Sequence, residues 1–412
     1  MTGGIAPDML DRGLAEDLAA ASLAMARRFA AGATLWCVAP SWEPHAHHMA
    51  VEFVHPVIVG KRALPAFALT GPDLVQRAGV AVRAGDILIA VAGRRDAVVA
   101  DLMRRAPAWG AASAWIGSGP RPPAGAADHL LWIDDPDPMA PATGRFVLLY
   151  HLLWELTHVC FEHPGLLTEA RPAGKREPQA AGFLYPFIDA DERDARPLLA
   201  ELATSARAKT AESAGLQQAT LAAGADRVAA AGAAMADRFA AGGRLYAFGN
   251  GGSATDCATF ATLLASPPAG APASSPANPP AYRALPALNL AADQAVVTAL
   301  GNDVGFDLVF SRQIIAHAAA RDIAVAFSTS GNSRDLMAAL HEARGRGLLT
   351  VGFAGYDGGE MAASGDVDYC FVVRSQSIHR IQESQALLGY HLWASTQRSL
   401  QQTGPNPHGG TQ

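Results

Sequence analysis

The sequence carries little charge. Only 17% of its 412 residues are Asp, Glu, Lys or Arg, and the formal net charge at pH 7 is −6. This balance gives no electrostatic reason to expect nucleic acid or an anionic membrane as a partner. Half of the residues are apolar, which favours well-buried α/β domains over a disordered or fibrous chain. The length favours more than one domain.

Cysteines and long apolar runs are also scarce. Cys37, Cys160, Cys257 and Cys370 show no CxxC or framework spacing, which predicts reduced thiols and a cytoplasmic location. No apolar run reaches the roughly 18 residues of a membrane span. The first residues, MTGGIAPDMLDRG, lack the apolar core of a signal peptide. We therefore expect a soluble cytoplasmic protein without a membrane partner.

What the sequence does contain is an internal repeat. Three pairs of blocks recur in the same order: residues 25–36 with 235–246, 62–69 with 283–290, and 85–93 with 321–329. The first pair, MARRFAAGATLW and MADRFAAGGRLY, reads as a helix end, a glycine stop and a buried strand. Each half then closes with a long apolar helix, over 146–161 and 381–400.

Both halves alternate helical periodicity with short apolar runs. The runs are LWCVA, ILIAVAG, SAWIGS and LLWID in the first half and RLYAFG, IAVAFST, LTVGFAG and DYCFVV in the second. Strands that alternate with helices predict a mostly parallel sheet covered on both faces. The predicted fold class is α/β, with two tandem doubly wound, flavodoxin-like three-layer domains.

Composition sets the predicted boundaries. The first domain covers 1–161, a linker rich in Pro, Gly and charge covers 162–200, and the second domain covers 201–402. The tail over 403–412 is expected to be disordered. The Pro-rich stretch over 266–283 is expected to be a mobile loop, because it suits neither a helix nor a central strand.

Two loops of the second half are rich in glycine and hydroxyl groups. GNGGS (249–253) follows the run RLYAF, and STSGNS (328–333) follows IAVAF. Hydroxyls and backbone N–H groups at a strand-to-helix turn bind oxyanions well. Ordinary turns use the same residue types. Two such loops, both placed after strands of a doubly wound sheet, nevertheless predict a phosphate site.

Further motifs identify a family. With GND (301–303), AGYDGGE (354–360) and RIQES (380–384), the two loops resemble the sugar isomerase (SIS) domain family. Within it they are similar to phosphoheptose isomerase, which interconverts sedoheptulose 7-phosphate and a heptose 7-phosphate, and to the non-enzymatic DnaA initiator-associating protein. The resemblance implies that the ligand is sedoheptulose 7-phosphate or a similar sugar phosphate. The residues implied as its contacts are Asn250, Gly251, Ser253, Asn302, Asp303, Ser328, Thr329, Ser330, Ser333 and Gln382.

The second half departs from the isomerase pattern. The isomerase carries a His and, four residues later, a Glu on the helix after GNGGS, and another His eight residues after the Gln of RIQE. Thr259, Leu263 and Tyr390 stand at these positions here. Thr and Leu cannot act as proton acceptors near neutral pH, and Leu cannot bind a metal. Glu383 and His379 remain candidate acid–base groups, but alone the second half is expected to bind rather than isomerise.

The first half shows the opposite pattern, so we interpret it as a degenerate SIS domain. APSW (39–42) and GRRD (93–96) stand where the hydroxyl-rich loops would be. His48 and Glu52 nevertheless resemble the isomerase's His-x-x-x-Glu, and His151 lies in a helix that resembles the segment carrying its last His. Positions i and i+4 share a helix face. A His/His/Glu set is known from zinc sites with an open position.

These observations leave several functions open. In the first, the halves form one composite site of a phosphoheptose isomerase-like aldose–ketose isomerase. Glu52 and His151 would then be catalytic, and His48, Glu52 and His151 would hold a metal, with zinc as the candidate. In the second, the chain is a non-catalytic sugar-phosphate sensor or an assembly protein. In the third, the first half is only a structural partner and its histidines are solvated or satisfied in the core. We also expect a homodimer of two-domain chains.

Overall fold

Two parallel sheets organise the chain in the computed structural model, which describes residues 3–58, 60–135, 137–167, 193–268 and 282–403. Contacts divide the chain into two units. The amino-terminal unit contains the described residues of Ile5–Asp137 and Phe146–Ala214. The carboxy-terminal unit contains Gly3 and Gly4, the segment Pro138–Arg145 and the described residues from Gly215 onward. The short segment Pro138–Arg145 therefore belongs by its contacts to the other half of the sequence.

The sheet of the amino-terminal unit has five parallel strands in the order β2-β1-β3-β4-β5. The strands are β1 (Leu35–Val38), β2 (Ala66–Ala68), β3 (Ile87–Val91), β4 (Ala112–Ser118) and β5 (His129–Ile133). The helices are α1 (Arg12–Ala30), α2 (Glu43–Val54), α3 (Leu74–Ala81), α4 (Ala97–Arg105) and α5 (Arg145–Cys160). The 3-10 turns are η1 (Ala106–Trp109), η2 (Ala140–Ala142) and η3 (Pro164–Leu166).

Alternation along these strands builds a core on each face of the sheet. Leu88 and Ala90 of β3 join one cluster with residues of α3 and α4, whereas Ile89 between them does not. No residue of α1 or α2 belongs to that cluster, although α1 contacts β5 and α2 contacts β1 and β2. α1 and α2 therefore cover the opposite face, which makes three layers.

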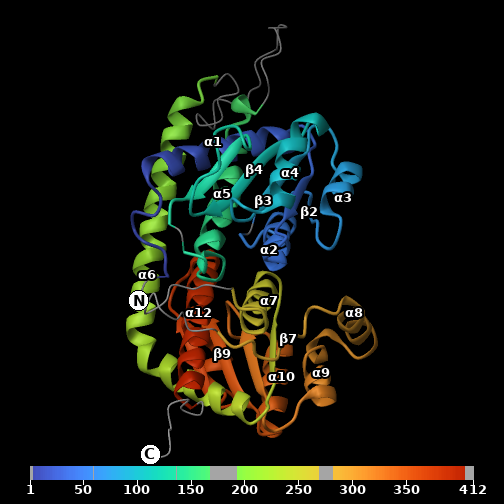
Figure 1. Cartoon of the computed structure of the whole chain (residues 1–412), viewed down its shortest axis with the longest axis vertical. Helices are drawn as coiled ribbons and strands as arrows, with labels where there is room; N and C mark the ends of the chain where they lie inside the picture. The colour runs from blue at the N-terminus through green and yellow to red at the C-terminus, as the bar shows by residue number, and fades with distance from the viewer. Residues whose placement is uncertain (1–2, 59, 136, 168–192, 269–281, 404–412) are drawn as a thin grey trace, which may run out of the picture. The chain divides into compact units, whose positions relative to one another are not determined.

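The carboxy-terminal unit repeats this topology. Its strands are β6 (Leu245–Gly249), β7 (Ala287–Asn289), β8 (Ile323–Phe327), β9 (Leu349–Gly355) and β10 (Tyr369–Val373), in the parallel order β10-β9-β8-β6-β7. The helices are α6 (Arg196–Ala240), α7 (Gly252–Ala265), α8 (Gln294–Asp303), α9 (Ser311–His317), α10 (Arg334–Gly345), α11 (Gly359–Ala363) and α12 (Ile378–Thr403), with the turn η5 (Phe306–Leu308). Figure 1 labels these elements along the chain.

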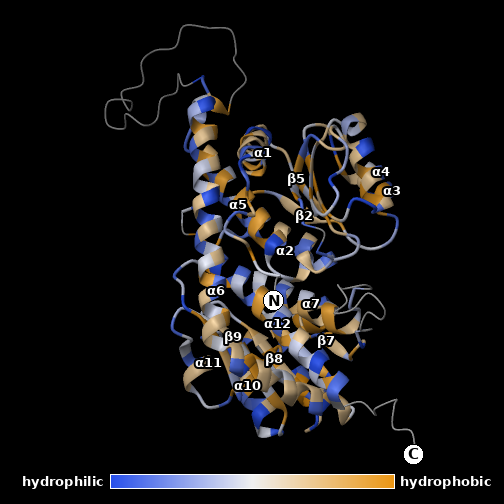
Figure 2. Cartoon of the chain, turned by 60° about the vertical axis from the view of Figure 1, so that its left-hand side comes forward, coloured by the Kyte–Doolittle hydropathy of each residue, from blue (hydrophilic) through white to orange (hydrophobic). Residues whose placement is uncertain are grey.

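Amphipathic helices cover this second sheet. α7 and α12 contact each other and the strands β6 to β10, and α9 and α10 pack together and join a different core cluster. In Figure 2 the helices α6 and α10 carry alternating hydrophilic and hydrophobic bands. This pattern is expected of helices with one buried stripe. α6 begins in the amino-terminal unit and crosses into the carboxy-terminal unit after Ala214.

Both sheets share one feature that positions a ligand site. In each sheet the first strand lies between the second and the third. The strand order therefore reverses direction at this strand. Ligands of doubly wound folds bind outside the carboxyl ends of the strands at such a switch point. The points lie between β1 and β3 in the amino-terminal unit and between β6 and β8 in the carboxy-terminal unit.

The fold predicted from the sequence is confirmed, since each predicted apolar run forms a parallel strand. The three-residue edge strands β2 and β7 were not predicted. Residues 168–192 of the predicted linker, 269–281 of the predicted loop and 404–412 of the predicted tail lie outside the described residues. The boundaries at 161, 200 and 402 stay predictions. Across the described parts of the chain, no helix is long and apolar enough to cross a membrane.

Candidate functional site

The two hydroxyl-rich loops leave neighbouring strands at one edge of the second sheet. Gly249, the last residue of β6, pairs in register with Phe327, the last residue of β8. The chains after them, which begin with Asn250 and Ser328, therefore emerge side by side at the switch point. Each then enters a helix within a few residues, α7 at Gly252 and α10 at Arg334. The helix N-termini add partial positive charge to this edge of the sheet.

The loop 328–333 is ordered by its own hydrogen bonds. The backbone N–H of Gly331 donates to Ser328 Oγ over 2.9 Å, and that of Asn332 donates to Ser330 Oγ over 3.2 Å. Gly331 has a φ of 69°, and a Cβ there would lie 2.2 Å from the Gly358 carbonyl oxygen. Only glycine fits this close approach. The loop is therefore held in one shape against the β9–α11 turn.

A buried carboxylate joins the two loops. Asn250 Nδ2 donates a hydrogen bond of 2.8 Å to Asp335 Oδ2, so the loop after β6 is tied to the first turn of α10. Asp335 is buried, and burial raises the pKa of its carboxyl above the usual value, while the hydrogen bond from Asn250 opposes the shift. The sequence analysis did not identify Asp335. Its only signal was an acidic residue in a first helical turn.

The amino-terminal part of α12 contacts the loop after β8. Gln385 Nε2 donates to the Ser328 carbonyl oxygen over 2.7 Å. Gln382, one turn earlier, is buried. Arg380 and Glu383 form a buried ion pair with 3.0 Å between Nη2 and Oε1. Gln385 was also missed, although it lies three residues after Gln382 and therefore on a neighbouring part of the helix surface.

The structure places most of the predicted sugar-phosphate contacts at this edge. They come from three places: the loop after β6 with the start of α7, the loop between β8 and α10, and the amino-terminal part of α12. These residues are Asn250, Gly251, Ser253, Ser328, Thr329, Ser330, Ser333 and Gln382. Asn302 and Asp303 differ, because they are exposed at the end of α8 and hydrogen-bond to each other over 2.7 Å. Within the described residues, no hydrogen bond joins that pair to the two loops.

The positions that correspond to the isomerase's two histidines and its glutamate lie on the expected helices, α7 and α12. Thr259 and Leu263 are one turn apart on α7, and Leu263 is only 1% exposed. Tyr390 lies on α12 with its ring centroid 5.7 Å from that of Trp393. His391 next to Tyr390 has a pKa lowered by burial.

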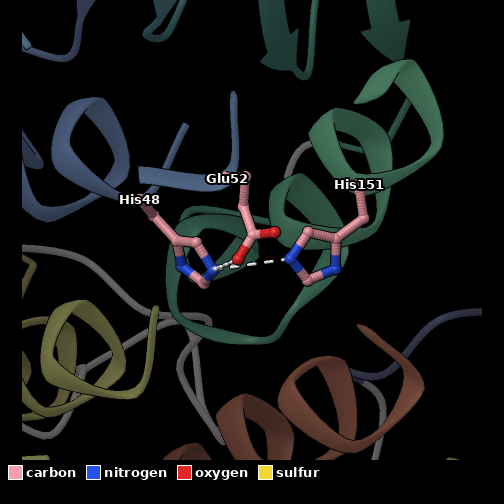
Figure 3. Close-up of side chains that lie close together, drawn as sticks. All are labelled: His48, Glu52 and His151. Atoms are coloured by element: carbon pink, nitrogen blue, oxygen red, sulfur yellow. Dashed lines mark hydrogen bonds and ion pairs between the residues drawn. The ribbon is translucent and has the colours of Figure 1, made fainter. Parts of the chain in front are cut away.

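His48, Glu52 and His151 converge in the amino-terminal unit. His48 and Glu52 come from α2 and His151 comes from α5, and the three side chains point toward one another (Figure 3). His48 Nε2 lies 3.4 Å from His151 Nε2 and 3.6 Å from Glu52 Oε1. Their exposed fractions are 2%, 2% and 0% in the order His48, Glu52, His151. The i, i+4 spacing on α2 thus brings a nitrogen and a carboxylate to the same place.

This geometry fits a divalent metal. The three ligand atoms lie within 4.8 Å of one another. Two imidazole nitrogens bound to zinc at tetrahedral angles are about 3.3 Å apart, and the observed separation of 3.4 Å is close to that value. Two imidazoles and a carboxylate also form a donor set typical of zinc. The structure thus places in one cluster the three residues that the sequence proposed as ligands.

Aromatic side chains line the cluster. The Tyr150 ring lies 5.1 Å from the His48 ring and 5.4 Å from the His151 ring, measured between centroids. The Tyr150 hydroxyl lies 3.4 Å from His45 Nδ1. Such packing limits the rotamers of the two imidazoles. The alternative that His45, His47 and His48 form a solvated cluster is wrong for His45 and His48, which are buried, and holds only for the exposed His47.

The switch point of the amino-terminal unit is unsuited to a phosphate. Asp96 caps α4 by accepting the backbone N–H groups of Val98 and Val99, each over 3.0 Å. Ser41 Oγ lies 3.4 Å from Asp96 Oδ2. A carboxylate therefore already occupies the helix N-terminus that would receive an oxyanion. The predicted loss of phosphate chemistry in this half is consistent with these contacts.

The fold and the carboxy-terminal loops define a class of protein, a doubly wound α/β protein with two hydroxyl-rich loops at a switch point. Comparison with known proteins makes this specific. The profile of the SIS domain family matches residues 210–355. A phosphoheptose isomerase of Geobacter sp. (strain M21) is 38% identical over 157 residues, which are 38% of this chain and 76% of the relative. The chain belongs to the SIS domain family.

Two further comparisons concern the extent of the likeness. A phosphoheptose isomerase of Sulfurimonas denitrificans is 42% identical over 142 residues, 34% of this chain and 67% of the relative. The structure of the C-terminal domain of glucosamine-fructose-6-phosphate aminotransferase from Francisella tularensis matches with a TM-score of 0.52. It is 12% identical and covers 93% of each chain. This last likeness concerns the fold, and it extends over both units.

Proposed function

We propose that the carboxy-terminal unit binds a phosphorylated sugar at the carboxyl ends of β6 and β8. The observation that carries this proposal is the pairing of Gly249 with Phe327, which puts the two hydroxyl-rich loops side by side. The hydroxyls of Ser253, Ser328 and Ser330 and the N–H groups at the starts of α7 and α10 would bind the phosphate. Gln382 would contact the sugar. Sedoheptulose 7-phosphate is the proposed ligand, because the matched relatives are phosphoheptose isomerases.

We further propose that the chain is an aldose–ketose isomerase. Glu52 would take a proton from C1 of the ketose, which adjoins the carbonyl carbon C2, and would deliver it to C2 through an enediol, while a proton moves from the C1 hydroxyl to the C2 oxygen. His151 would stabilise the charge that develops on the carbonyl oxygen. A zinc ion held by His48, Glu52 and His151 would supply Lewis-acid polarisation of that oxygen. The phosphate contacts would use binding energy to orient the reacting carbons.

A binding-only function is the second candidate. It is favoured by Thr259, Leu263 and Tyr390, which put no imidazole or carboxylate at the positions that carry them in the isomerase. In that case the chain would be a sugar-phosphate sensor or an assembly protein. The buried pair Arg380 and Glu383 would then serve to shape the ligand site rather than to move protons.

The composite site and the oligomeric state stay predictions. A single pocket that combines the groups of both units would require the ligand to reach Glu52 while its phosphate is bound by the loops. We expect a homodimer of two-domain chains. Sedimentation equilibrium at several protein concentrations tests it, and a mass of one chain throughout would exclude the dimer.

The experiment for the proposed function starts from metal-replete protein incubated with sedoheptulose 7-phosphate. NMR follows both the aldose product and the ligand signals. Turnover supports the isomerase. Shifted or broadened ligand signals without turnover favour the binding-only function. Unshifted signals without turnover reject both proposals for this sugar.

A further inference from the structure

A short segment from the first half of the sequence forms part of the ligand-site framework in the carboxy-terminal unit. We call residues 138–145 the strap. It follows β5 and leads into α5, both elements of the first half, yet its contacts place it in the carboxy-terminal unit. Its 3-10 turn η2 packs against α7 and α12. These are the two helices that begin with GNGGS and RIQES, so the strap touches both helices that carry proposed ligand contacts.

The strap is closely packed against the rest of the carboxy-terminal unit. Met139, Ala140 and Thr143 are fully buried. Arg145 Nε donates a hydrogen bond of 3.1 Å to the Gly4 carbonyl oxygen, and Gly4 also belongs to this unit. The strap is therefore hydrogen-bonded to Gly4 within the carboxy-terminal unit.

Gly144 of the strap lies close to the backbone of Glu383 in α12. Its φ is 81°, and a Cβ there would lie 2.4 Å from the Glu383 carbonyl oxygen and 3.4 Å from Gln217 Nε2. Gln217 Nε2 donates a hydrogen bond of 2.9 Å to that same carbonyl oxygen. The Glu383 backbone is thus held between the strap and α6. A side chain at position 144 would have to displace it.

The Glu383 backbone adjoins the proposed contacts. Gln382 precedes it, and Gln385, two residues later, donates to the Ser328 carbonyl oxygen. A shift of this turn would move Gln382 away from the sugar. The loop 328–333 keeps its internal hydrogen bonds, from Gly331 to Ser328 and from Asn332 to Ser330. The phosphate and sugar ends of the ligand should therefore respond differently.

We propose that Gly144 is a positioning residue for the sugar end of the ligand site, acting through the backbone of Glu383. The proposal rests on the proposed function, since it assumes that a phosphorylated sugar binds at these loops. It assigns a role in the carboxy-terminal site to a residue encoded in the first half, outside the region of the SIS domain match.

The test compares calorimetric affinities for sedoheptulose 7-phosphate and for inorganic phosphate. Gly144→Ala should lower the affinity for sedoheptulose 7-phosphate about tenfold, because small displacements of positioning groups are costly. It should change the affinity for inorganic phosphate less than about twofold. Gly125→Ala is the matched control. Its φ is 83° and its Cβ would meet nothing within 4 Å, so it adds the same backbone strain without the contact. It should change neither affinity.

A second variant keeps the test decisive if Gly144→Ala does not fold. Gln217→Met keeps the side-chain length and removes the amide donor to the Glu383 carbonyl oxygen. It should therefore also lower the affinity for sedoheptulose 7-phosphate more than the affinity for inorganic phosphate. Equal loss of both ligands, or no loss in a folded variant, would overturn the proposal while leaving the proposed function intact. If the unmodified protein binds no sugar phosphate, the proposed function fails first and the positioning role fails with it.

Discussion

The two units share one topology but carry different candidate site residues. In both, the first strand lies between the second and the third. The carboxy-terminal switch point has hydroxyl-rich loops, whereas Asp96 caps the corresponding helix in the amino-terminal unit. Conversely, His48 and Glu52 lie one turn apart on α2, where α7 has Thr259 and Leu263. The comparison teaches that the strand order of a doubly wound sheet does not depend on these residues. The amino-terminal unit keeps the order without the hydroxyl-rich loops, and the carboxy-terminal unit keeps it without the His and Glu pair.

The strongest test of this division is Glu52→Gln. If the buried carboxylate carries the proton, turnover of sedoheptulose 7-phosphate should fall about 100- to 10,000-fold. Affinity for the sugar phosphate should stay within about twofold, because the proposed contacts to the phosphate lie in the other unit. NMR measures turnover and calorimetry measures affinity. Glu43→Gln, at an exposed position on the same helix, is the control and should leave both unchanged. Full activity in the Glu52 variant would remove this residue from the mechanism.

Ser330→Asp tests the other half of the comparison. A carboxylate placed against the phosphate should weaken binding at least about 100-fold, since like charges repel strongly in a partly buried site. The zinc content of the purified variant should match that of the unmodified protein. Ser364→Asp, at an exposed position in the same unit, should bind normally. An unchanged affinity in Ser330→Asp would mean that the phosphate binds elsewhere.

Metal removal should affect stability through the amino-terminal unit. A metal present at about 1,000 times its dissociation constant contributes about 4 kcal/mol. At about 2 °C per kcal/mol for a large domain, a chelator should lower the melting temperature by about 8 °C. The chelator should have little effect on Glu52→Gln, because that variant lacks the carboxylate ligand. Equal shifts in both proteins, or none, would argue against a metal at His48, Glu52 and His151.

Asp335→Asn should give the smallest effect, and its sign depends on pH. Burial raises the pKa of Asp335 above 3.8 in the folded state. As pH rises past 3.8, the unfolded chain loses this proton before the folded chain does, so the free energy of unfolding decreases. Asn does not titrate. The variant should therefore gain stability relative to the unmodified protein between pH 3 and pH 7, as measured by urea denaturation. A constant difference across that range would contradict the shift.

Most of the fold was predictable because buried parallel strands read as short apolar runs. The predicted runs became the longer strands, whereas β2 and β7 have only three residues each and are partly exposed, which gives too weak a pattern. His48, Glu52 and His151 were proposed from the resemblance, and helical spacing added that His48 and Glu52 share a helix face. Their convergence depends on how α2 and α5 pack, which spacing alone does not determine.

The strap was not predictable from any local pattern. Gly144 and Glu383 are far apart in the sequence, and residues 138–145 look like an ordinary connection between a strand and a helix. Their role arises because chain contacts, rather than sequence order, decide which unit a segment joins. The Asn250–Asp335 hydrogen bond was missed for a related reason. A carboxylate in a first helical turn normally faces solvent, and its burial becomes visible only in three dimensions.

The strap also has a consequence for the order of events on the ribosome. Its native partners include Glu383 in α12, which leaves the ribosome roughly 240 residues later, or about 12 to 50 s at a synthesis rate of 5–20 residues per second. During that interval the amino-terminal sheet can close, while Met139 and Ala140 have no partner surface from α12. The segment is therefore a natural place for a chaperone to bind the nascent chain. Its burial would mark the moment at which α12 has become available for packing.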